Sequence, residues 1–288
     1  MDSEKLLDTP DHELATLAIA KTKEWSKPEP LISKKSKGRE YPLHALSPTI
    51  NETSNPRIGV ITLSTDFTIE QDFRKVCQGI DLDIFFNRIP FSNPLNHKNY
   101  LRMAEFIPEV TEQILPNQKL DVIAYGCTSG TIAIGEDIIT EQVHKKKPEA
   151  LVTTPITAAL KAFKKLNLKK IAVLTPYPKN VNLTIFNYLE KNNLAIDTFN
   201  SFNLNYDSEI AKVSHKSLLD NIAKINLENV DGLFVSCTAL KILDILEKVE
   251  KKHNTTVVSS NQAIIWDCLR LSNIDIKING YGKLFKEN

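Results

Sequence analysis

The chain has 288 residues and a formal net charge of +1, which excludes binding driven by bulk charge to nucleic acid or to an anionic membrane. Its 42% hydrophobic and 25% charged content is typical of a globular protein, and the length suggests about two domains. The amino-terminal residues lack the apolar core of a signal peptide, and no apolar run reaches transmembrane length. With 4 widely spaced cysteines, we expect free thiols in a reducing cytoplasm, without a disulfide framework or a zinc site.

Residues 1–56 differ in composition from the rest of the chain. Residues 11–25 place apolar side chains at helical spacing, whereas residues 26–56 are rich in Pro, Ser and Lys and show no sustained period. We therefore predict a helix at 11–25 within an amino-terminal arm or linker that precedes the core and packs on a neighbouring subunit.

Strand and helix patterns alternate regularly from Arg57 onward. Apolar, β-rich runs predict strands at 57–63, 83–89, 121–126, 150–154, 170–175, 195–200, 231–236 and 255–260. Helical patterns occupy 68–79, 97–116, 129–145, 155–166, 179–193, 207–226, 238–252 and 261–271. Strands separated by helices indicate an α/β fold with parallel sheets and right-handed crossovers.

The first and second sets of strands have matching sequences. Residues 120–130 (LDVIAYGCTSG) match residues 230–240 (VDGLFVSCTAL), and each segment has an acidic start and an apolar run that stops at Cys-Thr. The strands that begin at Arg57 and at Lys170 match at nearly the same spacing. We predict two pseudo-symmetric doubly wound domains, each with a four-stranded parallel sheet. The predicted boundaries are 57–165 plus 262–288 for the first half, and 166–261 for the second.

Cys127 and Cys237 end corresponding strands of the two halves. A single free cysteine is most often a small buried apolar residue, but a matched pair favours two thiols that face one small molecule from opposite sides. We expect a helix to begin just after each cysteine, at Ser129 and at Ala239. The free N–H groups of such a helix would stabilise a thiolate and bind a substrate carboxylate.

Other polar side chains follow the strands of both halves. The candidate substrate-binding residues are two acids, a tyrosine and the hydroxyls beside the cysteines: Asp66, Asp207, Tyr177, Thr128, Ser129 and Thr238. Each acid can instead cap the helix that follows it, and the tyrosine can be held by packing alone. Ser260 and Asn261 end the last strand and can face either the site or solvent, while Gly130 would let the backbone approach a ligand closely.

Competing cofactor motifs are missing from the sequence. It contains no G-x-x-x-x-G-K-[ST] phosphate loop, no G-x-G-x-x-G fingerprint and no closely spaced His or Cys set for a metal. We therefore expect chemistry without a cofactor or metal. Cys77 and Cys268 lie in apolar helical patterns and are predicted core residues, and the run at 145–147 is predicted to be a solvated helix end.

Two α/β halves with a Cys-Thr unit after the third strand of each resemble the aspartate/glutamate racemase superfamily. The segments around Cys127 (YGCTSG), Tyr177 (TPY) and Cys237 (SCTA) are similar to its maleate isomerase and arylmalonate decarboxylase branch. Residues 63–70 (LSTDFTIE) and 133–137 (AIGED) look most like the ectoine-utilisation relatives of that branch. The resemblance covers residues 57 to 275, about three-quarters of the chain.

The resemblance implies a small carboxylate substrate, an active site in the cleft between the two halves, and a homo-oligomer. In the racemases one cysteine thiolate removes a proton alpha to a carboxylate, and the opposite thiol returns one on the other face. In maleate isomerases the first cysteine adds to the double bond, the bond rotates, and the adduct collapses to fumarate. Arylmalonate decarboxylases keep only the second cysteine, so the presence of both Cys127 and Cys237 counts against a decarboxylase.

Asp66 and Asp207 depart from the maleate isomerase pattern, which has amide side chains at these positions. A carboxylate repels a substrate carboxylate, and instead suits a substrate ammonium or amide N–H, or a base for the thiol proton. Our first hypothesis is therefore a racemase or epimerase that acts on a small amino acid or N-acyl amino acid, with Cys127 and Cys237 as its acid/base pair. The acids would tune the thiols or bind the nitrogen, and the candidate hydroxyls would hold the carboxylate.

Two other hypotheses remain. The second is cis–trans isomerisation of maleate, with Cys127 as nucleophile and Cys237 as proton donor. The third is a non-catalytic ligand sensor that uses the same cleft, which the two retained thiols disfavour.

Overall fold

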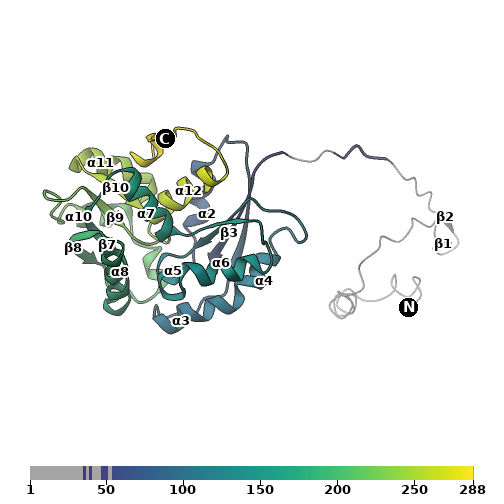
Figure 1. Ribbon diagram of the computed structural model, residues 1–288, viewed down its shortest axis with the longest axis horizontal. Coiled ribbons are helices and arrows are strands. Elements are labelled where there is room, and N and C mark those ends of the chain that lie inside the picture. Colours follow the sequence, from purple (N-terminus) through teal and green to yellow (C-terminus); the bar gives the residue numbers. More distant parts are fainter. Residues whose placement is uncertain (1–34, 37–38, 41–46, 51–53, 288) are drawn as a thin grey trace. The chain divides into compact units, whose positions relative to one another are not determined.

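The computed structural model describes residues 35–36, 39–40, 47–50 and 54–287 (Figure 1). Within the first 53 residues, β1 (Lys35–Ser36) and β2 (Arg39–Glu40) pair antiparallel. The helix predicted at 11–25 lies outside the described residues, together with most of the predicted arm. From Ser54 onward the chain forms one compact unit, which contains every predicted site residue.

Two four-stranded parallel sheets form the centre of this unit (Figure 1). The first contains β3 (Arg57–Leu63), β4 (Asp83–Ile89), β5 (Val122–Gly126) and β6 (Leu151–Thr153). The second contains β7 (Lys170–Thr175), β8 (Ala195–Ser201), β9 (Gly232–Val235) and β10 (Thr256–Ser259). The orders β4-β3-β5-β6 and β8-β7-β9-β10 are equivalent, so the predicted α/β fold with two such sheets is confirmed.

The strand order fixes where functional side chains can gather. In each sheet the chain crosses from one side to the other between the first and third strands, β3 and β5 or β7 and β9. Ligands of open α/β sheets bind beyond the carboxyl ends of strands at such a switch point. In the first half, the loop after β3 contains Asp66, and Cys127 follows β5. In the second half, Tyr177 follows β7 and Cys237 follows β9.

Helices cover the sheets and bury the four central strands on both faces, as parallel sheets require. The helices are α2 (Ile69–Val76), α3 (His97–Arg102), η1 (Met103–Phe106), α4 (Ile107–Glu112), α5 (Thr128–Ile134), α6 (Glu136–His144), α7 (Pro155–Lys165), α8 (Lys179–Lys191), α9 (Asp207–Ile210), α10 (His215–Ile222), η2 (Leu243–Ile245), α11 (Leu246–His253), α12 (Ser260–Leu271) and η3 (Leu284–Lys286).

Several predicted long helices are divided. The helix predicted at 97–116 is three short pieces, because Pro108 has no N–H for an internal hydrogen bond and instead occupies the first turn of α4. The helix predicted at 129–145 breaks at Gly135, whose φ of 98° leaves the helical region. The helix predicted at 207–226 becomes α9 and α10, and Ser214 caps the second of these.

The predicted helix at 238–252 begins later than expected. Residues 238–242 form a turn, which η2 and α11 follow, so the expectation of a helix starting at Ala239 is wrong. The carbonyl oxygens of Thr238 and Ala239 accept hydrogen bonds from side chains of Asn261 and Thr68. These side chains take the place of the backbone donors that a helix would supply.

Two crossover helices join the sheets. α7 follows β6 of the first sheet and contacts β10 of the second, while α12 follows β10 and contacts β5, β6 and α7. Asp267 of α12 accepts hydrogen bonds from the Thr153 hydroxyl and from Lys161, both at 2.6 Å. The division into halves at 165/166 and 261/262 stays a prediction.

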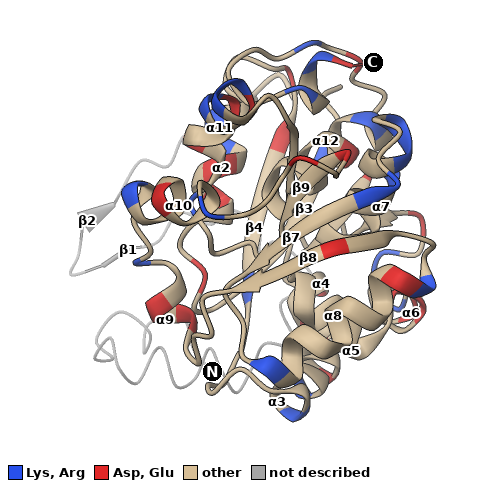
Figure 2. Ribbon diagram, turned by 90° about the vertical axis from the view of Figure 1, so that its left-hand side faces the viewer, with Lys and Arg blue, Asp and Glu red and all other residues tan. Residues whose placement is uncertain are grey.

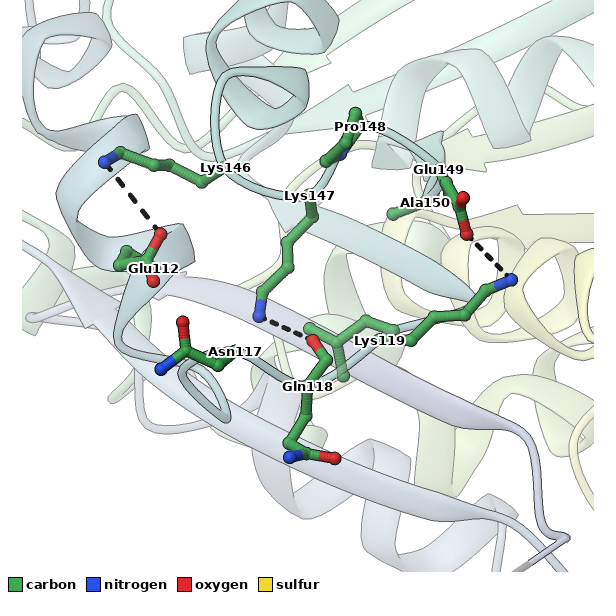
Figure 3. Close-up of a pocket in the computed structure, with 10 residues that line it drawn as sticks. Glu112, Asn117, Gln118, Lys119, Lys146, Lys147, Pro148, Glu149 and Ala150 are labelled. Carbon is green, nitrogen blue, oxygen red and sulfur yellow. Dashed lines mark hydrogen bonds and ion pairs between the residues drawn. The ribbon is translucent and has the colours of Figure 1, made fainter. Parts of the chain in front are cut away.

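Lys and Arg positions are interspersed with Asp and Glu positions along the ribbon in Figure 2. Lys147 departs from the predicted solvated helix end. It is buried, and its ammonium donates to the carbonyls of Leu115 and Gln118 at 2.8 Å (Figure 3). The pocket in Figure 3 is lined by Leu120 and Ala150, just before β5 and β6, so it lies at the opposite edge of the sheet from Cys127.

Asp267→Ala is expected to destabilise the protein because it leaves the buried Thr153 hydroxyl without its acceptor. We expect a loss of about 1–3 kcal/mol in the free energy of unfolding, measured by urea denaturation. Lys161 adds little to this loss because its side chain is half exposed and regains water. The control is Asp220→Ala, which removes an exposed pair with Lys216 and should leave the urea midpoint unchanged; equal losses in both variants would contradict the assignment.

Candidate active site

Cys127 caps the first turn of α5. Its Sγ accepts a hydrogen bond from the Gly130 N–H at 3.2 Å, and the Ser129 hydroxyl lies 3.9 Å away. A Cβ at position 130 would stand 2.8 Å from the sulfur and 2.6 Å from the methyl of Met103. Glycine is therefore needed here to make room for the thiol itself, in addition to the ligand approach that the sequence suggested.

Cys237 sits on the turn at 236–242. Its Sγ accepts a hydrogen bond from the Ala239 N–H at 3.4 Å, and the Tyr177 hydroxyl donates to it as well. Thr68 holds the Ala239 carbonyl at 3.0 Å and Asn261 holds the Thr238 carbonyl at 2.8 Å. The two thiols thus have different supports, a helix start for one and a side-chain-anchored turn for the other.

Asp66 caps a helix, which was one of its two alternatives, while its role in substrate binding stays a prediction. Its Oδ1 accepts the N–H groups of Thr68 at 2.7 Å and of Ile69 at 3.0 Å, which caps the start of α2. Its carboxyl group also accepts a hydrogen bond from the Thr238 side chain. The carboxyl group therefore links the start of α2 to the residue that follows Cys237.

Asp207 is the first residue of α9, and it does not cap this helix through its side chain. Its Oδ2 accepts a hydrogen bond from the Thr65 hydroxyl at 2.6 Å, which joins the loops after β3 and β8. The capping alternative for Asp207 is therefore wrong. Asp207 and Asp66 lie close enough for the charge of Asp66 to raise the pKa of Asp207.

Burial controls the protonation of all four groups. Removal from water raises the pKa of the Cys127 thiol to about 12, and raises the pKa of the Cys237 thiol strongly as well. Burial also raises the pKa of Asp207 to about 6 and that of Asp66 above its ordinary value. Both acids raise the pKa of both thiols further, whereas the N–H groups of Gly130 and Ala239 lower it. The expected effect of free backbone N–H groups on the thiols is therefore present, but burial outweighs it.

The predicted hydroxyls differ in where they point. Ser129 lies beside Cys127, and buried Tyr177 interacts with both cysteines. Thr238 binds Asp66, whereas the Thr128 hydroxyl is 2.9 Å from the hydroxyl of Ser260. Every predicted site residue is at most 6% exposed, so all of them are buried.

Tyr100 is a residue of this site that the sequence analysis missed. It comes from α3, it is 2% exposed, and its hydroxyl finds no hydrogen-bond partner among residues 54–287. Burial raises its pKa well above the ordinary value, Cys127, Asp207 and Cys237 raise it further, and the Ser129 side chain lowers it. No local motif marks this tyrosine, because it lies inside a helical pattern far from any strand end.

The described part of the chain contains no cluster of three or more His, Cys, Asp or Glu side chains suited to a metal ion. None of its helices is long and apolar enough to cross a membrane. Cys77 and Cys268 are buried, as predicted for core residues.

Together, the fold and the site define a class of protein with two like α/β halves, each presenting a cysteine at the end of its third strand. The chain belongs to the family described as arylmalonate decarboxylase, whose family model matches residues 100–285. The resemblance to the branch that also contains maleate isomerases is thereby supported, while the special likeness to ectoine-utilisation relatives stays a prediction.

Characterised relatives are enzymes of two kinds. A maleate isomerase of Nocardia farcinica is 21% identical over 250 residues, covering 81% of this chain and 96% of its own. An arylmalonate decarboxylase of Bordetella bronchiseptica is 31% identical over 139 residues, covering 47% of this chain and 58% of its own. A solved structure of the Nocardia farcinica maleate cis-trans isomerase, a mutant with a covalently bound succinylcysteine intermediate, superimposes with a TM-score of 0.76 at 19% identity. That superposition covers 82% of this chain and 100% of the isomerase, and it shows a shared fold.

The raised pKa of Asp207 predicts a pH-dependent stability. The folded state binds this proton more tightly than the unfolded state, so the stability contribution is full below the unfolded pKa of 3.8 and is lost as pH rises through about 6. Asp207→Asn should remove this loss and leave the variant more stable than wild type at pH 8, on the order of 1–3 kcal/mol. Urea unfolding at pH 5 and pH 8 measures the difference, and parallel profiles for the two proteins would show that Asp207 titrates normally.

Proposed function

We propose that this chain is a cofactor-independent isomerase that inverts the alpha carbon of a small carboxylate bearing an amino or N-acyl group. The observation that carries the proposal is one buried site with two thiols and two carboxyl groups, in which both acids raise the pKa of both thiols. Cys127 and Cys237 act from opposite faces of the substrate. One thiolate takes the alpha proton and becomes a thiol, while the opposite thiol gives a proton and becomes a thiolate, so no other reactant is consumed.

The acids favour a substrate that carries nitrogen. Each thiolate would form beside two carboxyl groups, which raise the pKa of both thiols. A substrate ammonium between Asp66 and Asp207 would neutralise this charge and lower the pKa of both thiols. An N-acyl substrate would instead donate its N–H to one of the acids. A dianion without nitrogen would add negative charge where it is already costly.

Hydroxyl groups beside the thiols suit the substrate carboxylate. Loss of the alpha proton moves negative charge onto this carboxylate, so donors aimed at its oxygens stabilise the transition state. Ser129 lies next to Cys127, and Tyr177 interacts with both thiols. Tyr100 offers a further hydroxyl, which is unpaired within the described region. The hydroxyls of Thr128 and Thr238 already interact with Ser260 and Asp66, so these two residues hold the loops beside the thiols and do not bind the carboxylate themselves.

Maleate cis–trans isomerisation is the second candidate. It is supported by the maleate isomerases of Nocardia farcinica and Alcaligenes faecalis, which match 81% and 79% of this chain. In this reaction Cys127 would add to the double bond, Cys237 would supply a proton to the neighbouring carbon, and the adduct would lose both after rotation. The acid pair disfavours it, because maleate carries two negative charges and no cation.

The first prediction of this proposal concerns proton exchange. Wild-type protein in D2O should exchange the alpha proton of an amino acid or N-acetyl amino acid with inversion, followed by NMR and polarimetry. Cys127→Ser and Cys237→Ser should each reduce inversion by about 10³-fold or more, because a serine hydroxyl is a far weaker acid and base than a thiol. Cys77→Ser, which changes a buried cysteine at the end of α2, is the matched control and should retain the rate.

Other results would redirect the assignment. If the protein forms fumarate from maleate but does not exchange the alpha proton of amino acids, the second candidate is favoured. Release of carbon dioxide from an arylmalonate would indicate a decarboxylase. Thermal stabilisation by a ligand without any turnover would indicate a sensor, and full activity in both serine variants would overturn the two-thiol mechanism.

A second prediction tests the role of the acid pair. Asp207→Asn keeps the shape of the side chain and the acceptor for Thr65 while it removes a negative charge. We expect KM for the nitrogen-bearing substrate to rise about tenfold, and any activity with maleate to increase. Steady-state kinetics on both substrates measure the change. An unchanged ratio of the two kcat/KM values would show that Asp207 does not discriminate between substrates by their charge.

A further inference from the structure

The first turn of α12 contacts the residues that follow both cysteines. The Ser260 hydroxyl lies 2.9 Å from the hydroxyl of Thr128, the residue after Cys127. The adjacent Asn261 donates its Nδ2–H to the carbonyl oxygen of Thr238, the residue after Cys237, at 2.8 Å. Both α12 side chains are fully buried, so a single helical turn touches both cysteine loops.

Helix capping does not account for these two polar residues. Thr154 and Thr157 form a capping box at the start of α7, and Ser259 and Gln262 form the same box at the start of α12. Between the box residues α7 has Pro155 and Ile156, whereas α12 has Ser260 and Asn261. The polar pair is therefore a departure from the internal symmetry, and it occurs only on the helix that reaches both cysteines.

Asn261 is itself anchored from behind. Its Nδ2 also donates to Oδ2 of Asp72 in α2 at 2.8 Å, and its Oδ1 has no hydrogen-bond partner within residues 54–287. Asp72 is buried and takes no part in the proposed reaction. Asp66, Lys75 and Asp244 are the charged groups that act on it. This carboxyl group restricts the amide to the orientation in which it holds the Thr238 carbonyl.

The turn at 236–242 depends on its contact with Asn261 more than the loop at Cys127 depends on its contact with Ser260. Cys127 is held by the N–H of Gly130 within α5, a regular helix that supplies its own hydrogen bonds. Beyond Cys237 the Thr238 carbonyl is held by the Asn261 side chain. Removing this donor leaves a buried carbonyl unpaired, which favours displacement of the turn and of its thiol.

We propose that Ser260 and Asn261 are positioning residues that fix Cys127 and Cys237 relative to one another. The inference rests on the proposed function for its meaning in catalysis, because proton transfer from opposite faces requires both sulfurs near the same carbon. A displacement of about 1 Å in a reacting group costs up to about 10²-fold in rate. Neither side chain touches the substrate, so their loss should act on kcat with little change in KM.

The test compares Asn261→Ala with Gln262→Ala. Gln262 is the next residue of the same helix; its amide donates at 2.7 Å to the carbonyl of Tyr281, and its Oε1 accepts the Ser259 N–H of the capping box. Gln262→Ala therefore weakens the same helix start without removing a contact to either cysteine loop. We expect Asn261→Ala to lower kcat about 10- to 100-fold with KM within about threefold, and Gln262→Ala to preserve kcat. Ser260→Ala should show a smaller loss of kcat, and it keeps the proposal testable if Asn261→Ala fails to fold.

A second readout does not depend on turnover. Iodoacetamide labelling, resolved by peptide mass spectrometry, reports the reactivity of Cys237 relative to Cys127 in the same molecule. Asn261→Ala should raise this ratio about threefold or more, because the released turn opens locally, and Gln262→Ala should leave it unchanged. Ser260→Ala should lower the ratio, since it frees the loop beside Cys127.

The outcomes separate the two proposals. If wild type turns over no substrate but the labelling ratios change as expected, the positioning role stands and the proposed function fails. If wild type is active while Asn261→Ala keeps both its kcat and its labelling ratio, the positioning role is overturned and the function stands. Equal effects of Asn261→Ala and Gln262→Ala would also overturn it, since they would reflect general loss of stability.

Discussion

Exclusion of water from the two thiols is the constraint on which the chemistry of this site depends. Burial raises the pKa of Cys127 to about 12 and makes the Cys237 thiol equally reluctant to ionise. Nearby Asp66 and Asp207 add to this effect, since either carboxylate disfavours a second negative charge. Burial and the two carboxyl groups thus disfavour thiolate formation, and a positive charge placed beside the carboxyl groups would change this balance. A substrate cation is the simplest source of that change, which connects the choice of substrate to the activation of the thiol.

The duplicated fold explains why these groups meet. Each half places its switch point between its first and third strands, and the carboxyl ends of these strands carry one loop and one cysteine. Crossover helices α7 and α12 then join the halves, each following a strand of one sheet and contacting the other sheet. Because α12 starts at the end of β10 and crosses to β5 and β6, its first turn passes both cysteines. The connection between the halves is therefore also a structural part of the site.

The four central strands were predictable because burial on both faces leaves continuous apolar runs. Each predicted strand, central or at an edge, ends within one residue of the observed one. Helix ends were less predictable, because Pro108, Gly135 and the turn after Cys237 override an otherwise helical pattern. The repeated Cys-Thr units identified the two thiols that the structure brings together. Their roles, like those of the other predicted site residues, stay predictions.

What the sequence did not reveal are contacts between residues far apart in the chain. Tyr100 carries no motif, the Ser260 hydroxyl pairs with Thr128 at a separation of 132 residues, and Asn261 pairs with Asp72 at 189. Such pairs depend on how α12 and α2 cross, which no local pattern records. The departure from internal symmetry at the start of α12 was the one feature of the sequence that pointed to the contacts of Ser260 and Asn261. A comparison of the two halves position by position would have found it.

Unequal support gives the two cysteines different tasks in the proposed reaction. Cys127 receives the Gly130 N–H at 3.2 Å from a helix that holds its own shape, so its sulfur has a fixed donor ready when charge develops. Cys237 receives a longer contact of 3.4 Å from Ala239, and its remaining donor is the phenol of Tyr177. Because Cys127 has a fixed backbone donor, its sulfur is the better placed of the two to carry the negative charge of a thiolate. Cys237 lies on a turn held by side chains, so it is better suited to remain a neutral thiol. Cis–trans isomerisation uses Cys127 as the nucleophile and Cys237 as the proton donor, and inversion uses them as base and acid in one of its two directions. The same asymmetry therefore serves inversion and cis–trans isomerisation, and the acids that face the thiols decide between them.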